Sequence, residues 1–112
     1  VVTTLDMDGA IQEKTLNSTT ITGNTALNAG SGTVQRWVLS GNVNITDSLN
    51  EGESITLVID DGSGRTITWD YSSLNIEWVG GSAPTLDTTN ETIVVIWKVN
   101  STLYGMASGV AS

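Results

Sequence analysis

The sequence predicts an all-β fold, and three observations carry that prediction. Charged residues make up only 14% of the 112-residue chain, so Thr, Ser and Asn must supply most of its polar surface. β-branched side chains fit a pleated sheet better than a helix, where they lose rotamer freedom. Turn-forming residues recur about every eight to twelve positions without any helical periodicity between them. We therefore expect a single domain over residues 1–112, an antiparallel β-sandwich or barrel, jelly-roll-like, with about seven to nine short strands.

The first half of the chain contains two weak strand candidates and one clear one. Segments 10–16 and 19–30 are the weak candidates. Residues 34–39, VQRWVL, are the first clear strand, and the turn formers at 40–42 are expected to close it. Segment 43–49, VNITDSL, then follows as a partner or an edge strand.

The strongest local pattern lies in residues 54–71. In SITLVID, residues 54–60, the apolar side chains of Ile55, Leu57 and Ile59 fall on one face, with the period of two that a strand shows. RTITWDY follows at residues 65–71 with a similar alternation, and the sequence between the two segments, DGSG, favours a turn. The pattern predicts an antiparallel hairpin over this stretch.

A second hairpin is expected near the end of the chain. Residues 93–99, IVVIWKV, form a nearly continuous apolar run, which is typical of a central strand covered on both faces. Asn100 and Ser101 then favour a turn into TLYGMAS, residues 102–108. The loop before this hairpin, from Trp78 onward, holds two glycines and the only proline of the chain, and it is interpreted as a specified bend that carries the chain to the central strand.

Composition argues against several classes of function. A formal net charge of −8 disfavours nucleic acid and anionic membranes as partners. The chain has no histidine and no cysteine, and so lacks the commonest general base, metal ligand and nucleophile. Asp6 to Gly9 and Asp60 to Gly62 lack the ligand spacing of a calcium loop and are interpreted as turns. We expect no enzymatic activity, no catalytic residues, no cofactor and no metal site.

The four tryptophans are many for this length. Trp37 and Trp97 lie inside apolar strands and are expected in the core. Trp69 and Trp78 stand beside acids and glycines, and together with Tyr71 they are the candidate contacts for a glycan or a protein partner. Asp70 and Glu77 are the only acids with aromatic neighbours, but a domain this small would need a partner to complete a sugar-cleaving cleft.

Three stretches of the sequence resemble a module of tailed-phage virion proteins. They are GTVQRWVLSGN at 32–42, LNEGESITLVIDDGSGRTITW at 49–69 and WVGGSAPTLDTTNETIVVIWKVNSTLYGMASG at 78–109. A weaker match opens the chain, where Asp8, Gly9, Ala10 and Glu13 correspond to an LDGAxxE segment of such proteins. One departure is Asn90–Glu91, where the pattern has a glycine after the threonine pair.

The resemblance to this family, known from tail-fibre and structural proteins of marine and cyanobacterial phages, implies a non-enzymatic virion component. It implies a β-domain on the tail or the capsid surface, as a fibre or spike module or a decoration protein. Its partners would be identical subunits, as a homotrimer, and other virion proteins. The chain would be a complete domain or a fragment or processed form of a longer virion protein. The alternative function is a carbohydrate-binding module that recognises host glycans.

Overall fold

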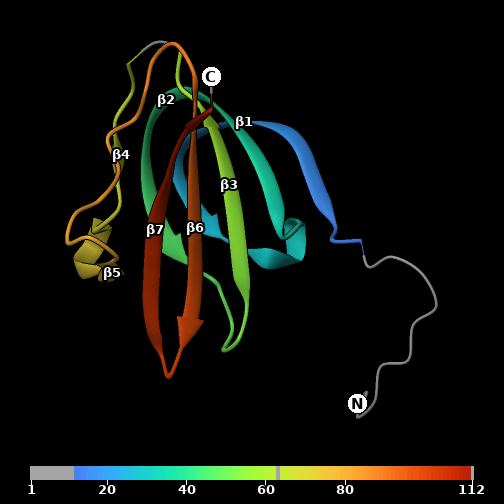
Figure 1. Cartoon of the computed structure of the whole chain (residues 1–112), viewed down its shortest axis with the longest axis vertical. Coiled ribbons are helices and arrows are strands. Elements are labelled where there is room, and N and C mark those ends of the chain that lie inside the picture. The colour runs from blue at the N-terminus through green and yellow to red at the C-terminus, as the bar shows by residue number, and fades with distance from the viewer. Residues whose placement is uncertain (1–11, 63, 112) are drawn as a thin grey trace.

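The computed structural model describes residues 12–62 and 64–111 of the chain. Seven strands account for most of this part, and its helical segments are two single 3-10 turns, η1 (Ala29–Ser31) and η2 (Tyr71–Ser73). The strands are β1 (Thr15–Leu27), β2 (Val34–Asp47), β3 (Ser54–Asp60), β4 (Ile67–Thr68), β5 (Ile76–Trp78), β6 (Glu91–Val99) and β7 (Thr102–Ala111) (Figure 1). The all-β prediction is confirmed, and the number of described strands falls within the expected range.

The strands form one mixed sheet, so the prediction of an antiparallel, jelly-roll-like sandwich or barrel is wrong. Their order is β1-β2-β3-β6-β7-β5, and β4 pairs with β2 beside this path. The pairs β1–β2, β2–β3, β2–β4 and β5–β7 are parallel, whereas β3–β6 and β6–β7 are antiparallel. The parallel pairing of β1 with β2 depends on the shape of these two strands.

The long strand β2 curls until its two ends approach each other. Ser48 N, just past its end, donates a hydrogen bond to Leu27 O at 3.1 Å. Gln35 lies near the beginning of β2, and its Nε2 donates to the carbonyl of Asn28, the residue after Leu27, at 2.9 Å. A parallel pairing of straight strands needs a crossover of roughly a dozen residues or more. Because the strands curl, residues 28–33 are enough to carry the chain from the end of β1 to the beginning of β2.

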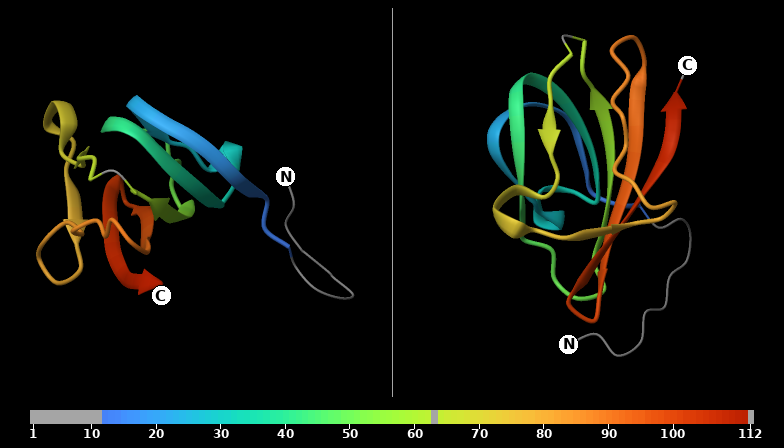
Figure 2. Two further views of the ribbon diagram at one scale, coloured as in Figure 1. Left: turned by 90° about the horizontal axis from the view of Figure 1, so that it is seen from above. Right: turned by 90° about the vertical axis from the view of Figure 1, so that its left-hand side faces the viewer.

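Successive coils of the chain therefore stack side by side, with register shifts in the β1–β2 ladder between Leu16 and Thr19 and between Ile21 and Gly23. Val34 pairs with Thr15 on one side and with Thr56 on the other. Half a coil further on, Val43 pairs with Gly23 and with Ile67 in the same way. β1, β2 and the pair β3 and β4 thus form three consecutive levels, and the curvature of the first two is visible in Figure 1 and in the right view of Figure 2.

The hairpin predicted for residues 54–71 is wrong, because the two segments stack on β2 and do not pair with each other. β3 pairs with β2 and β6, while the chain after Gly62 turns away and β4 joins the second half of β2. The expected turn after residues 34–39 is also absent, because β2 continues through residues 40–42 to Asp47. Gly41 allows β1 to approach there, since a Cβ at this position would lie 2.2 Å from Thr22 Oγ1. Segment 43–49 is therefore mostly the second half of the same strand.

The weak candidates at the beginning of the chain have a mixed outcome. Most of segment 19–30 lies in β1, as predicted. Residues 12–14 precede that strand, and residues 10 and 11 lie outside the described residues, as do Asp8, Gly9 and Ala10 of the opening motif and the acidic turn at Asp6 to Gly9.

The core lies inside the curl. Alternate residues of β2 and β3 point into it, among them Trp37, which is 1% exposed, as predicted. Gln35 is the buried polar residue of this layer, with 3% of its surface exposed. Its Nε2 donates to Asn28 O and Gly32 O, both at 2.9 Å, and its Oε1 accepts from Trp37 Nε1 at 2.9 Å. A single side chain thus makes hydrogen bonds both to the loop at residues 28–33 and to the buried Trp37.

The predicted C-terminal hairpin is confirmed. β6 and β7 are antiparallel and meet at Asn100 and Ser101, whose φ angles of 51° and 61° give the left-handed turn that matches strand twist. Both carboxylate oxygens of Glu51 accept hydrogen bonds from the backbone N–H groups of these two residues. β6 is central, between β3 and β7, as expected.

Gln35→Leu is expected to destabilise the fold by roughly 3 kcal/mol, because it leaves Trp37 Nε1 and Gly32 O without their partner and removes one of the hydrogen bonds that Asn28 O accepts. Chemical denaturation followed by tryptophan fluorescence measures the change. Gln12→Leu, at an exposed position, is the matched control and should stay within about 0.5 kcal/mol of the parent. Equal stability of the two variants would contradict the role given to Gln35.

Ser101→Gly is expected to stabilise the protein by about 0.5 kcal/mol, because glycine adopts the left-handed conformation without the penalty that serine bears there. Thermal unfolding checks this, with Ser54→Gly as the control. Ser54 is exposed at the start of β3, without a positive φ, and glycine should there be mildly destabilising. The same sign of change in both variants would refute the turn argument.

Candidate functional site

A pocket of about 430 Å³ lies where β4, β5 and the loop after β5 meet. Its lining comes from residues 67–70, from Asn75, Ile76 and Trp78, and from residues 81–83. Figures 1 and 2 place β4 and β5 at the side of the molecule opposite β1. The pocket is therefore formed by one continuous stretch of the chain, residues 67–83, at the far end of the stacked coils.

The two tryptophans predicted as contact residues meet in this pocket. Their rings pack edge to face, with centroids 5.2 Å apart and planes at 79°. Trp69 is only 6% exposed and forms part of the core, whereas Trp78 is partly exposed. Aromatic pairs favour this geometry. The structure thus makes Trp78 the accessible member of the pair and Trp69 its buried support.

Trp78 is held in place from its other side by the backbone of β7. It pairs with Gly105, and a Cβ on that glycine would lie 2.5 Å from Trp78 Cζ3 and 2.7 Å from Cε3. Only glycine leaves room for the indole at this position. The ring is therefore fixed between Trp69 and β7 before any ligand arrives.

The loop that forms the pocket mouth is itself ordered by hydrogen bonds. Gly81 N donates to Trp78 O at 2.9 Å, and Gly80 and Gly81 take φ angles of 91° and 92°, which glycine adopts without strain. Further along, Asp87 Oδ1 accepts from the N–H groups of Asn90 and Thr89, and these bonds hold the pKa of that carboxyl below its usual range. The bend predicted from the sequence leads to the central strand β6, as expected.

The remaining predicted residues divide between the pocket and its surroundings. Tyr71 begins η2 and does not line the pocket. Asp70 does line it, whereas Glu77 does not and instead accepts a hydrogen bond from Asn75 Nδ2 at 2.8 Å. Sequence reasoning missed Asn75 and Ser82, although the position of Ser82 directly after the two glycines was a usable signal.

A second surface stands out on the outer face of β6 and β7. Trp97, which the sequence places in the core, is only partly buried here and stacks on Tyr104 with centroids 5.9 Å apart and planes at 19°. Ile93 and Val95 share this face with Trp97 and are also only partly buried, and Met106 is 38% exposed. The expectation that β6 is covered on both faces is therefore wrong. We call Ile93, Val95, Trp97, Tyr104 and Met106 the outer face.

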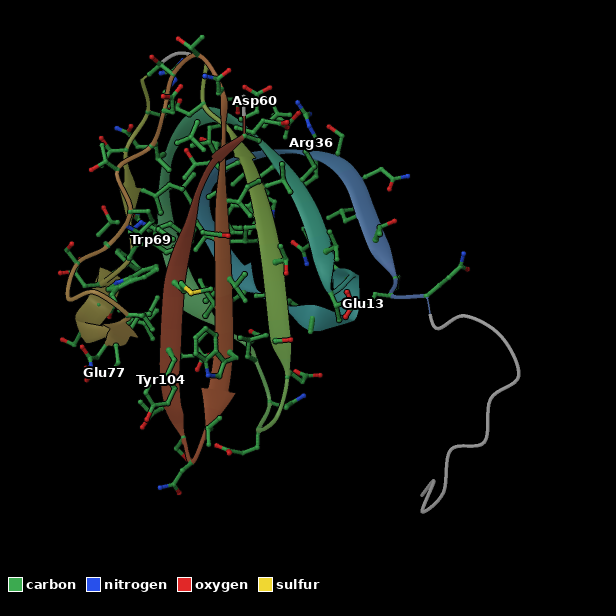
Figure 3. All side chains as sticks on the ribbon, in the orientation of Figure 1. Glu13, Arg36, Asp60, Trp69, Glu77 and Tyr104 are labelled. Atoms are coloured by element: carbon green, nitrogen blue, oxygen red, sulfur yellow. The ribbon has the colours of Figure 1, made fainter. Side chains whose placement is uncertain are left out.

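The acidic turn at Asp60 and Asp61 has structural partners. Arg36 donates to Asp60 Oδ2 at 2.9 Å and to Glu91 Oε2 at 2.7 Å, and Figure 3 shows Arg36 and Asp60 side by side. The hydrogen bond to Glu91, with the attraction of Asp60, raises the pKa of Arg36. Asp61 is buried, and its Oδ1 accepts from Arg65 N at 2.8 Å. The turn interpretation is confirmed at this place.

Within 12–62 and 64–111, no three His, Cys, Asp or Glu side chains gather where they could hold a metal ion. The helical segments described above are too short to cross a membrane.

Comparison of the chain with known protein families, with curated proteins and with solved structures gives no significant match.

Gly105→Ala is expected to lower stability by about 1–3 kcal/mol, because the added methyl group displaces Trp78 from β7. Chemical denaturation measures the loss, and the indole N–H signal of Trp78 in an NMR spectrum should shift with it. Gly62→Ala is the control, since a Cβ there meets nothing within 4 Å and its φ is not positive. An unmoved Trp78 signal in Gly105→Ala would disprove the contact.

Proposed function

We propose that the chain is a non-enzymatic structural component of a bacteriophage virion, a tail-fibre or spike module or a capsid decoration protein. In this role it contacts identical subunits and other virion proteins on the tail or capsid surface. The observation that carries the assembly role is the outer face of β6 and β7. The virion assignment is supported by the resemblance of three stretches of the sequence to tailed-phage structural proteins.

The chemistry of the outer face suits a protein contact. It joins aromatic, aliphatic and thioether side chains, and none of its five residues is charged. Lys98, between Trp97 and Val99 on β6, donates to Asp47 Oδ2 at 2.6 Å and to Leu49 O at 2.7 Å, which ties its charge to the loop after β2. Aromatic residues and methionine are enriched where proteins meet, and charged residues are depleted there.

The net charge makes this face the favoured place for self-association. Copies that each carry a charge of −8 repel one another wherever their acidic surfaces approach. An uncharged apolar face reduces that repulsion and gains from the water it releases. Identical subunits would therefore meet here.

The free edge of β7 offers a second element for the contact. β5 pairs with β7 only through Leu103, Tyr104 and Gly105, so among the described residues β7 has β6 alone as a neighbour from Met106 onward. Val110 in this stretch is 46% exposed. Unpaired strand edges bind further strands readily. Closed assembly around a three-fold axis, the arrangement implied by the resemblance, would cover this edge.

Met106→Glu tests the contact, because a charge in the middle of the outer face should break a subunit interface without disturbing the core. Sedimentation of the parent chain over a range of concentrations is expected to show an oligomer, with the trimer as the proposed species, and the variant should be shifted toward monomer. Val79→Glu is the control, since Val79 is 59% exposed and lies outside the outer face. A parent chain that stays monomeric at high concentration and is missing from the protein inventory of purified virions would refute the proposal.

A further inference from the structure

The pocket beside Trp78 combines an apolar floor with a polar rim. Ile67, Trp69 and Ile76 form the floor, and each is at most 8% exposed. Asp70, Asn75 and Ser82 stand at the exposed rim. A volume of about 430 Å³ lies in the range of small-ligand pockets, toward its lower end. The pocket therefore suits one ring-sized ligand that has both apolar and hydroxylated surfaces.

The aromatic wall of the pocket is rigid. Trp78 lies between the edge-to-face contact with Trp69 and the close contact with Gly105, so its ring loses little freedom when a ligand binds. Binding sites gain affinity when their groups are held in place beforehand, because less side-chain entropy is lost. The C–H face of a sugar ring is the kind of apolar surface that a fixed indole can contact.

The rim offers hydrogen-bond acceptors. Asp70 precedes η2 without a side-chain capping bond, which leaves its carboxylate for a ligand. Asn75 uses its amide nitrogen on Glu77, so its Oδ1 is the atom available to accept. Hydroxyl groups donate to both kinds of oxygen, and bonds to a carboxylate are the stronger ones.

The charge of the pocket selects against anions. No lysine or arginine contributes to its lining, and Asp70 adds a negative charge at the rim. The whole chain has only four basic residues against twelve acidic ones. A sialic acid, a uronic acid or a phosphorylated sugar would have no cation to pair with here.

We infer that this pocket binds one neutral hexose unit, whose ring contacts Trp78 and whose hydroxyl groups donate to Asp70 and Asn75. This inference goes beyond the assembly role and does not depend on it, because the outer face and the pocket share none of their residues. A free sugar and a unit of a glycan chain present the same chemistry to the pocket. Free hexoses and methyl glycosides distinguish these two sources. The methyl glycoside has a substituted anomeric oxygen, as a unit of a glycan chain does, whereas the free hexose does not.

The test is an NMR titration of the indole N–H signals of the full chain. The probes are glucose, galactose, mannose and N-acetylglucosamine, each as the free sugar and as its methyl glycoside, with glucuronic acid and N-acetylneuraminic acid as the anionic arm. At least one neutral sugar is expected to shift the signals of Trp69 and Trp78 saturably at millimolar concentration. Trp37 and Trp97, which do not line the pocket, are internal controls and should stay in place.

Two variants sharpen the test. Asp70→Asn should weaken binding roughly tenfold, because a hydrogen bond to a charged acceptor is lost. Glu13→Gln, which removes an exposed charge away from the pocket, should leave binding unchanged. Ala83→Phe, at an exposed position of the lining, should fill the mouth and abolish binding while the Trp37 and Trp97 signals stay in place.

Three outcomes would overturn the inference. The first is the absence of any shift with every neutral sugar, and the second is an equal shift of all four tryptophan signals. The third is binding of the anionic sugars as tight as that of the neutral ones. Failure here would leave the oligomeric state measured for Met106→Glu untouched, so the two proposals are tested separately.

Discussion

The fold depends on closing a curled strand over a short return loop. Residues 28–33 bring the chain from the end of β1 back to its beginning, and the carbonyls of Asn28 and Gly32 in this loop face the side chain of Gln35. Gln35 resolves this constraint because its amide donates to both of those carbonyls and its oxygen accepts from Trp37. A buried network in which each partner is satisfied also fixes one register, since a shifted strand would leave these groups without partners.

The pocket is a consequence of the same curl. The second half of β2 turns away from β3. The edge of β2 that this leaves free pairs with β4 at Val43 and Asn44. That pairing sets Ile67 to Asp70 opposite β5, which in turn lies beside β7. Trp69, just after β4, and Trp78 on β5 meet where β4, which pairs with β2, lies beside β5, which pairs with β7. Neither residue could be placed by its local sequence, since their contact depends on how far β2 bends.

Alternation along the chain was enough to predict most strands, but it did not predict their partners. Residues 54–71 carry two alternating segments around a glycine-rich turn, the usual signature of a hairpin. Asp61 Oδ1 accepts a hydrogen bond from Arg65 N beside that turn, and Ile67 pairs with β2 instead of β3. The hairpin at Asn100 was predictable because its turn is tight and its strands adjoin. Trp97 was misplaced because an apolar run looks the same whether a second layer of its own chain or another molecule covers it.

The two surfaces lie on opposite sides of β7, because successive residues of a strand point to opposite faces. Gly105 faces inward, against Trp78, while Tyr104 and Met106 face outward. The proposed subunit contact would therefore cover one side of this strand and leave the pocket on the other side open. Substitutions on the outer face change side chains that are at least partly exposed, whereas any side chain added at Gly105 displaces Trp78 directly. An assembly built on the outer face would thus repeat the pocket once per subunit, and weak binding of a single sugar unit would add up over the copies that reach the same glycan surface.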